Sequence, residues 1–161
     1  QNAKIANISV YNRRLYSLDT QNNQVYKHDA IKTGFSQGKE WTKNNTTDIK
    51  TGVDLTIDGD VFVLGQNGVV YKFTNGAAEP FTITGLYPEL KSADEIWTYN
   101  DLNYIYILDA AGKRIIVLEK TGQLKKQITA AEFISPASMI VDEQKGVAYV
   151  LDSNKVYQIS L

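Results

Sequence analysis

Three aspartates stand at equivalent places in a repeated phrase, and their spacing raises the question of metal chemistry. Asp19, Asp109 and Asp152 each follow an aliphatic residue at the end of a short apolar run. Carboxylates from several repeats could ring a cation, but the ligands of calcium sites usually lie closer in sequence. We therefore expect each Asp to cap the turn that follows it through bonds to backbone N–H groups, and we expect no metal site.

Other reactive groups are few. The chain has one histidine, His28, and no cysteine, which excludes His-rich metal sites, disulfides and cysteine nucleophiles. No Gly-x-Ser-x-Gly, phosphate-binding or dinucleotide motif is present, so we expect no cofactor and no catalytic residue. Aromatic side chains are better candidates for recognition, because flat rings gain contact area at low entropic cost. The candidate ligand-binding residues are Trp97, Tyr99, Trp41 and Tyr87.

Charge and hydropathy limit the partners. Lys and Arg number 17 and Asp and Glu number 18, which gives a formal net charge of -1. Because nucleic-acid binding depends on basic side chains that neutralise phosphates, we expect no nucleic-acid partner. No apolar run approaches the roughly 20 residues needed to cross a bilayer. We therefore expect a soluble chain with no membrane insertion.

The aspartates belong to a phrase that occurs four times. In Tyr104–Lys120, two apolar runs flank a polar turn, and an aromatic residue anchors the first run. Short strands repeated at this period are typical of propeller blades rather than of helical repeats. The sequence therefore predicts an all-β fold, a β-propeller with four blade-like repeats. The anchors are Tyr16, Phe62, Tyr106 and Tyr149, at spacings of 46, 44 and 43 residues.

We expect one propeller domain over residues 1–161, with blades at about 5–50, 53–90, 93–133 and 137–161. Asp58-Gly59 and Asn67-Gly68 favour hairpin turns in the second blade. We expect Pro80–Thr84 to form the outer strand of that blade, where the missing proline N–H costs least. The fourth blade ends after its third strand. Trp97 falls on an expected innermost strand, so burial between blades is the favoured interpretation of this residue.

The four repeats are compatible with several ways of closing the ring. Four blades could form a tight ring in one chain, half of a larger ring, or part of a ring whose other blades belong to a longer protein. Two identical half-rings that meet about a twofold axis would hide all their end faces, and this symmetry is the commonest in oligomers. A homodimer that closes a larger ring is therefore the arrangement we favour.

The third and fourth repeats resemble the NHL repeat. In the fourth repeat, PASMIVD at 136–142 is followed by GVAYVLDSNKV at 146–156: a proline, an apolar strand ending in Asp, a glycine, and a second strand ending in Asp before a basic residue. The second repeat departs from this pattern, with Gly65 in place of Asp. YVTN-type bacterial surface propellers are nearly as similar. The resemblance implies a β-propeller and says little about function, because the motif describes how a blade is built.

Three classes of function follow. The favoured one is a non-enzymatic recognition or scaffold module that binds a protein, peptide or glycan through loops held by rigid blades. The second is a propeller enzyme or metal-binding module with polar residues around a central channel. The third is a sensory or adhesive domain appended to a larger bacterial signalling protein, of which this chain would be an extracytoplasmic part. The sequence does not fix the compartment.

Overall fold

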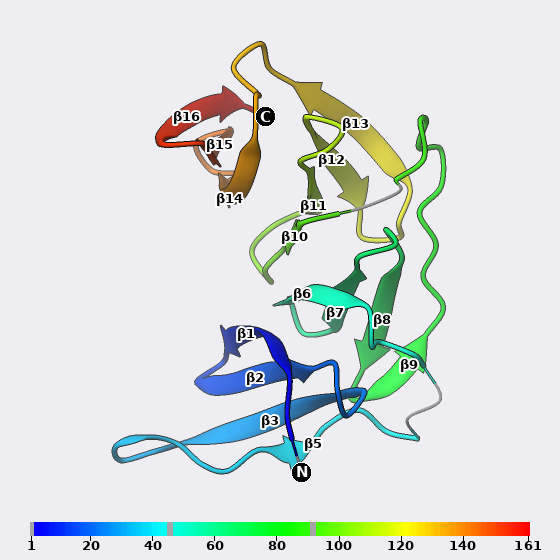
Figure 1. Ribbon diagram of the computed structural model, residues 1–161, viewed down its shortest axis with the longest axis vertical. Helices are drawn as coiled ribbons and strands as arrows, with labels where there is room; N and C mark the ends of the chain where they lie inside the picture. The colour runs from blue at the N-terminus through cyan, green and yellow to red at the C-terminus, as the bar shows by residue number, and fades with distance from the viewer. Residues whose placement is uncertain (1, 45–46, 91–92) are drawn as a thin grey trace.

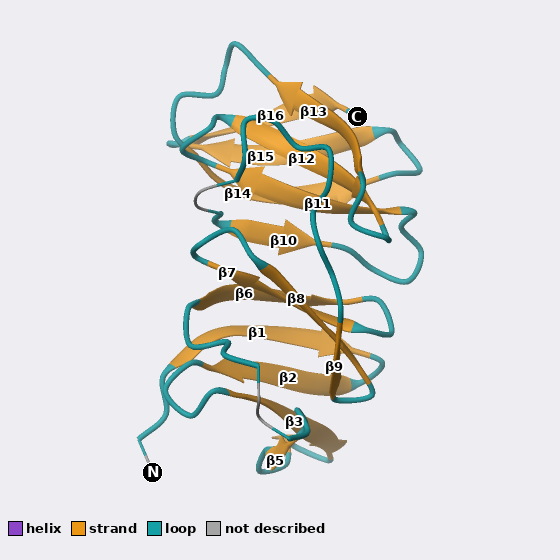
Figure 2. Cartoon of the chain, turned by 90° about the vertical axis from the view of Figure 1, so that its right-hand side faces the viewer, coloured by secondary structure: helices purple, strands orange, loops and turns teal. Residues whose placement is uncertain are grey.

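The computed structural model describes residues 2–44, 47–90 and 93–161, and these ranges are all-β. Their sixteen strands form four antiparallel sheets, which are the blades of a β-propeller and confirm the predicted fold class. The blades follow one another in chain order around an arc, with blade one and blade four at opposite ends of the molecule (Figures 1 and 2). Within the described ranges, no helix is long and apolar enough to cross a bilayer.

Blade one is built on a meander of three strands, with two short strands at its outer edge. Its first hairpin is closed by Asn12 and Arg13, whose φ angles of 46° and 62° give a turn that suits the twist of paired strands. The strands of this blade are β1 (Ile5–Tyr11), β2 (Arg14–Asp19), β3 (Gln24–Ile31), β4 (Gly34–Phe35) and β5 (Lys39–Glu40).

Blade two has the strand order β6, β7, β8, β9, and its outer strand is not the one expected. Asn75 and Gly76 have φ angles of 50° and 84° and turn the chain straight back, so the outer strand forms before Pro80. The segment Pro80–Thr84 instead leaves the blade, and Thr84 forms a parallel bridge to Gln123 of blade three. The strands are β6 (Gly52–Ile57), β7 (Val61–Gly65), β8 (Val70–Thr74) and β9 (Ala77–Glu79).

Blade three has four strands and blade four has three, each in chain order. The innermost strands of all four blades, β1, β6, β10 and β14, line the concave side of the arc (Figure 1). Blade three consists of β10 (Glu95–Trp97), β11 (Tyr104–Asp109), β12 (Arg114–Glu119) and β13 (Leu124–Thr129). Blade four consists of β14 (Pro136–Asp142), β15 (Val147–Asp152) and β16 (Lys155–Ser160).

The core lies between the blades rather than inside them. Tyr106 and Leu108 of blade three, for example, pack with Met139 and Val150 of blade four in one buried cluster. The anchors and leucines of blades one and two face the next blade in the same way. We call the face that looks toward the next blade in the chain the forward face, and the opposite one the rear face. Because each interior blade is covered on both faces, every residue of β7 is buried.

Candidate functional site

The four aromatic candidates do not form one surface. Trp97 and Tyr99 lie together, with their ring centres 6.1 Å apart. Trp41 packs edge-on against Tyr16 at 5.7 Å, in the cluster between blades one and two. Tyr87 is 85% exposed on the connection between blades two and three. Of the four, only Trp97 and Tyr99 are brought together by the fold.

Trp97 and Tyr99 line a cavity of about 190 Å³ on the concave side of the arc, which we call the inner pocket. Trp97 is half-buried and also packs against the cluster between blades three and four. Tyr99 reaches blade one, where its hydroxyl donates a hydrogen bond of 3.0 Å to the carbonyl of Val10. The inner pocket is lined by Asn7, Ile8, Ser9, Asp54, Leu55, Thr56, Glu95, Ile96, Trp97 and Tyr99.

Two carboxylates meet at the inner pocket, Asp54 from blade two and Glu95 from blade three. This pair is absent from the sequence-based prediction, because its members belong to different repeats. The signal that could have found it is positional. In each repeat the residue that pairs with the recurring leucine of the second strand is polar. These residues are Asn7, Asp54, Glu95 and Ser138.

Each carboxylate of the pair accepts a hydrogen bond from the backbone of the next blade. The Oδ2 atom of Asp54 accepts a hydrogen bond of 2.8 Å from the backbone N–H of Ile96 in blade three. The Oε2 atom of Glu95 accepts one of 2.6 Å from the backbone N–H of Met139 in blade four, and Oε1 accepts one of 3.2 Å from the Ser138 hydroxyl. The two side chains therefore join three innermost strands in series.

The setting of the pair changes its protonation. Burial raises the pKa of Asp54 to about 6, although bonds from backbone N–H groups and from the Asn7 side chain act in the opposite direction. Burial also raises the pKa of Glu95 to about 7, and the charge of Asp54 adds to this effect. At neutral pH the pair therefore titrates, whereas ordinary carboxyls are fully ionised.

The recurring aspartates bind backbone groups near them. Asp19 accepts bonds from the N–H groups of Gln21 and Asn22, at 3.0 and 3.1 Å, and so caps the turn after β2. Burial opposes the charge of Asp19, but a bond from the Asn22 side chain, together with the bonds from backbone N–H groups, outweighs burial and lowers the pKa of Asp19. Asp152 instead accepts bonds from the N–H groups of Ile134 and Ser135, which fixes the connection before β14.

Asp109 has a second role in addition to the expected cap. It accepts a bond of 2.7 Å from the N–H of Gly112, and it forms an ion pair of 2.8 Å with Arg114 in which both side chains are buried. Arg114 also donates to the Gln127 side chain and to the carbonyl of Pro88. The pair therefore ties the connection between blades two and three to blade three. In the described part of the chain, no group of three or more His, Asp or Glu side chains is placed to hold a metal ion.

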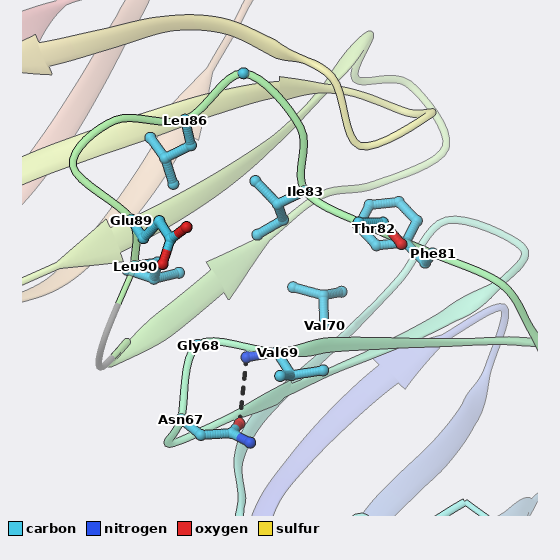
Figure 3. A pocket seen from close by; sticks show the side chains of 11 residues that line it. Asn67, Gly68, Val69, Val70, Phe81, Thr82, Ile83, Leu86, Glu89 and Leu90 are labelled. Atoms are coloured by element: carbon cyan, nitrogen blue, oxygen red, sulfur yellow. Dashed lines mark hydrogen bonds between the residues drawn. The ribbon is translucent and has the colours of Figure 1, made fainter.

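A second cavity, of about 450 Å³, lies between the start of β8 and the connection that follows blade two (Figure 3). Figure 3 shows the aliphatic side chains of Val70, Ile83 and Leu86 gathered around it. The side chain of Asn67 at its edge accepts a bond of 3.2 Å from the N–H of Val69, which shapes the turn (Figure 3). The polar side chains of Asn67, Thr82 and Glu89 also line it, so the cavity is of mixed polarity.

Comparison with known proteins identifies the fold. No family model matches the chain, and no curated protein matches it in sequence. BamB from Moraxella catarrhalis aligns with a TM-score of 0.61 and 16% identity over 98% of this chain and 43% of its own. A chain of a nidogen/laminin complex aligns with a TM-score of 0.60 and 18% identity over 82% of this chain and 51% of its own. A catalytically inactive virginiamycin B lyase from Staphylococcus aureus, solved with quinupristin, aligns with a TM-score of 0.60 and 13% identity over 97% of this chain and 55% of its own.

At these identities the likeness shows the fold alone. The chain spans about half the length of each of these three proteins. Since a component of a binding complex and a lyase share its architecture, the fold does not choose between recognition and catalysis. The chain has the blades of a β-propeller, and no narrower family is identified.

Proposed function

We propose that the chain is a non-enzymatic recognition module whose inner pocket holds one sugar ring of a glycan. The observation that carries the proposal is the meeting of Trp97 and Tyr99 beside hydrogen-bonding side chains of three blades. Aromatic rings offer an amphipathic face to the C–H groups of a sugar, while Asn7 and Ser9 offer partners to its hydroxyls. A volume of about 190 Å³ suits a single ring rather than an extended ligand.

The engagement of the carboxylates favours recognition over catalysis. Oxygens of Asp54 and Glu95 already accept bonds from the backbone of the next blade. A general acid or base must be free to reach the substrate proton it transfers. The same bonds hold the pocket walls in place, and rigid walls reduce the entropic cost of binding.

Fluorescence of Trp97 tests this proposal. The chain has two tryptophans, so Trp41→Phe leaves Trp97 as the only indole reporter. We expect a panel of disaccharides, chitobiose and cellobiose among them, to contain a probe that shifts its emission saturably. In that background Tyr99→Ala should weaken binding at least about tenfold, because one face of the site is lost. The exposed Tyr87→Ala is the matched control and should leave the titration unchanged.

Two results would contradict the proposal. One is a flat titration with every sugar. The other is an equal affinity in the Tyr99→Ala variant. Basic and acidic peptides form the second arm of the panel, and saturable binding of a peptide in place of a sugar would move the proposal from glycans to proteins.

An enzyme with polar residues at the inner pocket is the second candidate. The observation that favours it is the raised pKa of both Asp54 and Glu95, because groups that titrate near neutral pH are suited to proton transfer. Turnover of a sugar probe, lost in Glu95→Gln with binding retained, would support this candidate over pure recognition.

We also propose a blade type and a setting for the module. The blades are of the NHL or YVTN type, as the phrases of repeats three and four favour. The module serves as a sensory or adhesive part of a larger bacterial protein, a role that suits variable loops held by rigid blades.

A further inference from the structure

The third strand of blade two has an open edge where the third strand of blade three is covered. In blade three, β12 pairs with the outer strand β13 over residues 114–118. In blade two, β8 pairs with the outer strand β9 only over residues 72–74. Val70 and Ile115 are equivalent, because each pairs with the recurring leucine of the second strand. In the described part of the chain, Ile115 therefore has an outer-strand partner and Val70 has none.

The backbone groups of Val70 point to this open edge. The carbonyl of Val69 accepts a bond of 2.8 Å from the N–H of Gly65, on the side of β7. Because successive residues of an antiparallel strand direct their N–H and C=O groups to alternate sides, those of Val70 face away from β7. Lys72, two residues on, uses this outer side to pair with Glu79 of β9. An extended chain placed beside Val70 would therefore continue the ladder that β9 begins.

A cavity lies beside the open edge. It is the cavity of about 450 Å³ shown in Figure 3, which we call the edge cavity. Val69 and Val70 of the edge line it together with Phe81 and Ile83 of the connection that follows blade two. Its volume falls within the range of about 300–1,000 Å³ that ligand sites occupy. Blades two and three both have a blade on either side, so the edge cavity does not arise from an end of the chain (Figure 1).

The charge of the edge cavity favours a basic occupant. Among the described residues that line it, Glu89 is the only one with a charged side chain. Figure 3 shows the Glu89 carboxylate directed into the space between Ile83 and Val69. Val69 is 43% exposed, so the cavity is open to solvent beside this charge. A carboxylate at the opening attracts basic side chains and repels acidic ones.

We propose that the edge cavity binds an extended peptide of a protein partner, which adds a short strand to the open edge of β8. The peptide backbone pairs with Val70, one apolar side chain enters the cavity, and a neighbouring basic side chain meets Glu89. In strand addition, main-chain hydrogen bonds give affinity and pockets for alternate side chains give specificity. The site lies away from the innermost strands that line the inner pocket, and it does not depend on the function proposed there.

Fluorescence polarisation of labelled heptapeptides tests the proposal. The basic probe has a central leucine between two valines and a lysine at each end, and the acidic probe has glutamates in place of the lysines. We expect saturable binding of the basic probe, and binding at least about tenfold weaker for the acidic probe. N-methylation of one alternate set of amides removes the donors to β8 and should weaken the basic probe at least about tenfold. The other alternate set faces solvent, so its N-methylation should be tolerated.

Exposed positions supply the protein variants. Val69→Arg places a bulky cation at the opening and should weaken the basic probe at least about tenfold. Val156→Arg, the same change at an exposed valine of blade four, is its matched control and should leave binding unchanged. Glu89→Gln should weaken the basic probe about fivefold, because an exposed ion pair contributes little. Glu132→Gln removes an exposed carboxylate before blade four and should have no effect.

Circular dichroism checks that each variant remains folded. A basic probe that does not bind saturably would overturn the proposal. So would equal affinity for the acidic probe, or a Val69→Arg variant that binds as the wild type does. Full affinity in both N-methylated probes would show that no strand is added to β8.

Discussion

Blade three and blade four carry the same phrase in opposite surroundings. Tyr106 and Leu108 are buried beneath blade four, while Tyr149 and Leu151 occupy the same positions one repeat later and are partly open to solvent. The phrase decides which face of the blade is apolar. Whether that face contributes to the stability of the chain depends on what lies next to it.

The interface between blades three and four also has polar contacts at its rim, made by Glu143. Glu143, in the first turn of blade four, accepts a bond of 2.9 Å from the Tyr106 hydroxyl and bonds of 2.8 to 3.0 Å from the N–H of Asn103. Burial and this carboxylate both raise the pKa of Tyr106. A blade therefore binds its neighbour through a buried anchor and a polar contact at the rim.

The largest difference in the free energy of unfolding should lie between variants of the two aromatic anchors, Tyr106 and Tyr149. Tyr106→Ala removes a buried ring and its bond to Glu143, and should lower the free energy of unfolding by about 3–5 kcal/mol. Tyr149→Ala, the matched variant, should cost about 1 kcal/mol or less in the isolated chain. Urea melts at low protein concentration measure both. Equal losses would show that the two faces are equally covered and would break the comparison.

The ion pair of blade three should give the next effect. Asp109→Ala leaves the buried Arg114 without its carboxylate and should cost about 3 kcal/mol. Asp152→Ala should cost less, since Asp152 has bonds to backbone N–H groups and, among the described residues, no ion-pair partner. Adding Arg114→Leu to Asp109→Ala should restore part of the loss. If the double variant is no more stable than Asp109→Ala, the loss comes from the turn cap rather than from the unpaired charge.

The carboxyl groups of Asp54 and Glu95, on the innermost strands of the two interior blades, should make the free energy of unfolding depend on pH. Folding raises the pKa of Asp54 to about 6 and that of Glu95 to about 7, so the folded chain binds more protons than the unfolded chain between about pH 4 and 7. The free energy of unfolding should therefore fall as the pH rises through this window, by on the order of 2–3 kcal/mol between pH 5.5 and 7.5.

Thermal melts at pH 5.5 and 7.5 measure this dependence. The double variant Asp54→Asn, Glu95→Gln should flatten it, since no raised carboxyl remains at the inner pocket. The aspartates whose pKa is lowered, such as Asp19 and Asp60, act only at lower pH. Stability that rises between pH 5.5 and 7.5 would contradict the assignment.

The smallest effect should lie on the terminal face. Val156→Ser changes a residue that is largely exposed in blade four, and in the isolated chain it should alter the free energy of unfolding by less than about 0.5 kcal/mol. Val117→Ser, on the buried third strand of blade three, is the interior counterpart and should cost several times more. Denaturant melts of the two variants at low concentration give the ratio. A large loss in Val156→Ser would mean that the face is covered within one chain.

The sequence predicted the repeats because each one carries its own local signals. The aromatic anchor, the leucine two positions on and the turn residues lie within one phrase, so blade construction is visible at short range. The prediction for the outer strand of blade two was also wrong for a local reason. Pro80–Thr84 was expected to be the outer strand because a missing proline N–H costs least there, but Asn75-Gly76 had already reversed the chain.

The site was less predictable, because its parts come from different repeats. Asp54 and Glu95 meet only when blades two and three stack, and neither stands in a motif. Tyr99 likewise reaches Val10 across the concave side of the arc. Comparing equivalent positions of the four repeats would have revealed the polar residue opposite each recurring leucine, but not that these residues bond to the next blade.

Chemical labelling of single cysteines tests most directly the claim that the same phrase is covered in blade three and open in blade four. The chain has no cysteine, so Leu108→Cys and Leu151→Cys each contain one thiol, at equivalent positions of the two blades. Leu108 is 0% exposed and Leu151 is 39% exposed. We expect a thiol reagent to modify Leu151→Cys in the native chain, and to modify Leu108→Cys only after unfolding in urea. Equal protection of the two cysteines in the native chain would contradict the account.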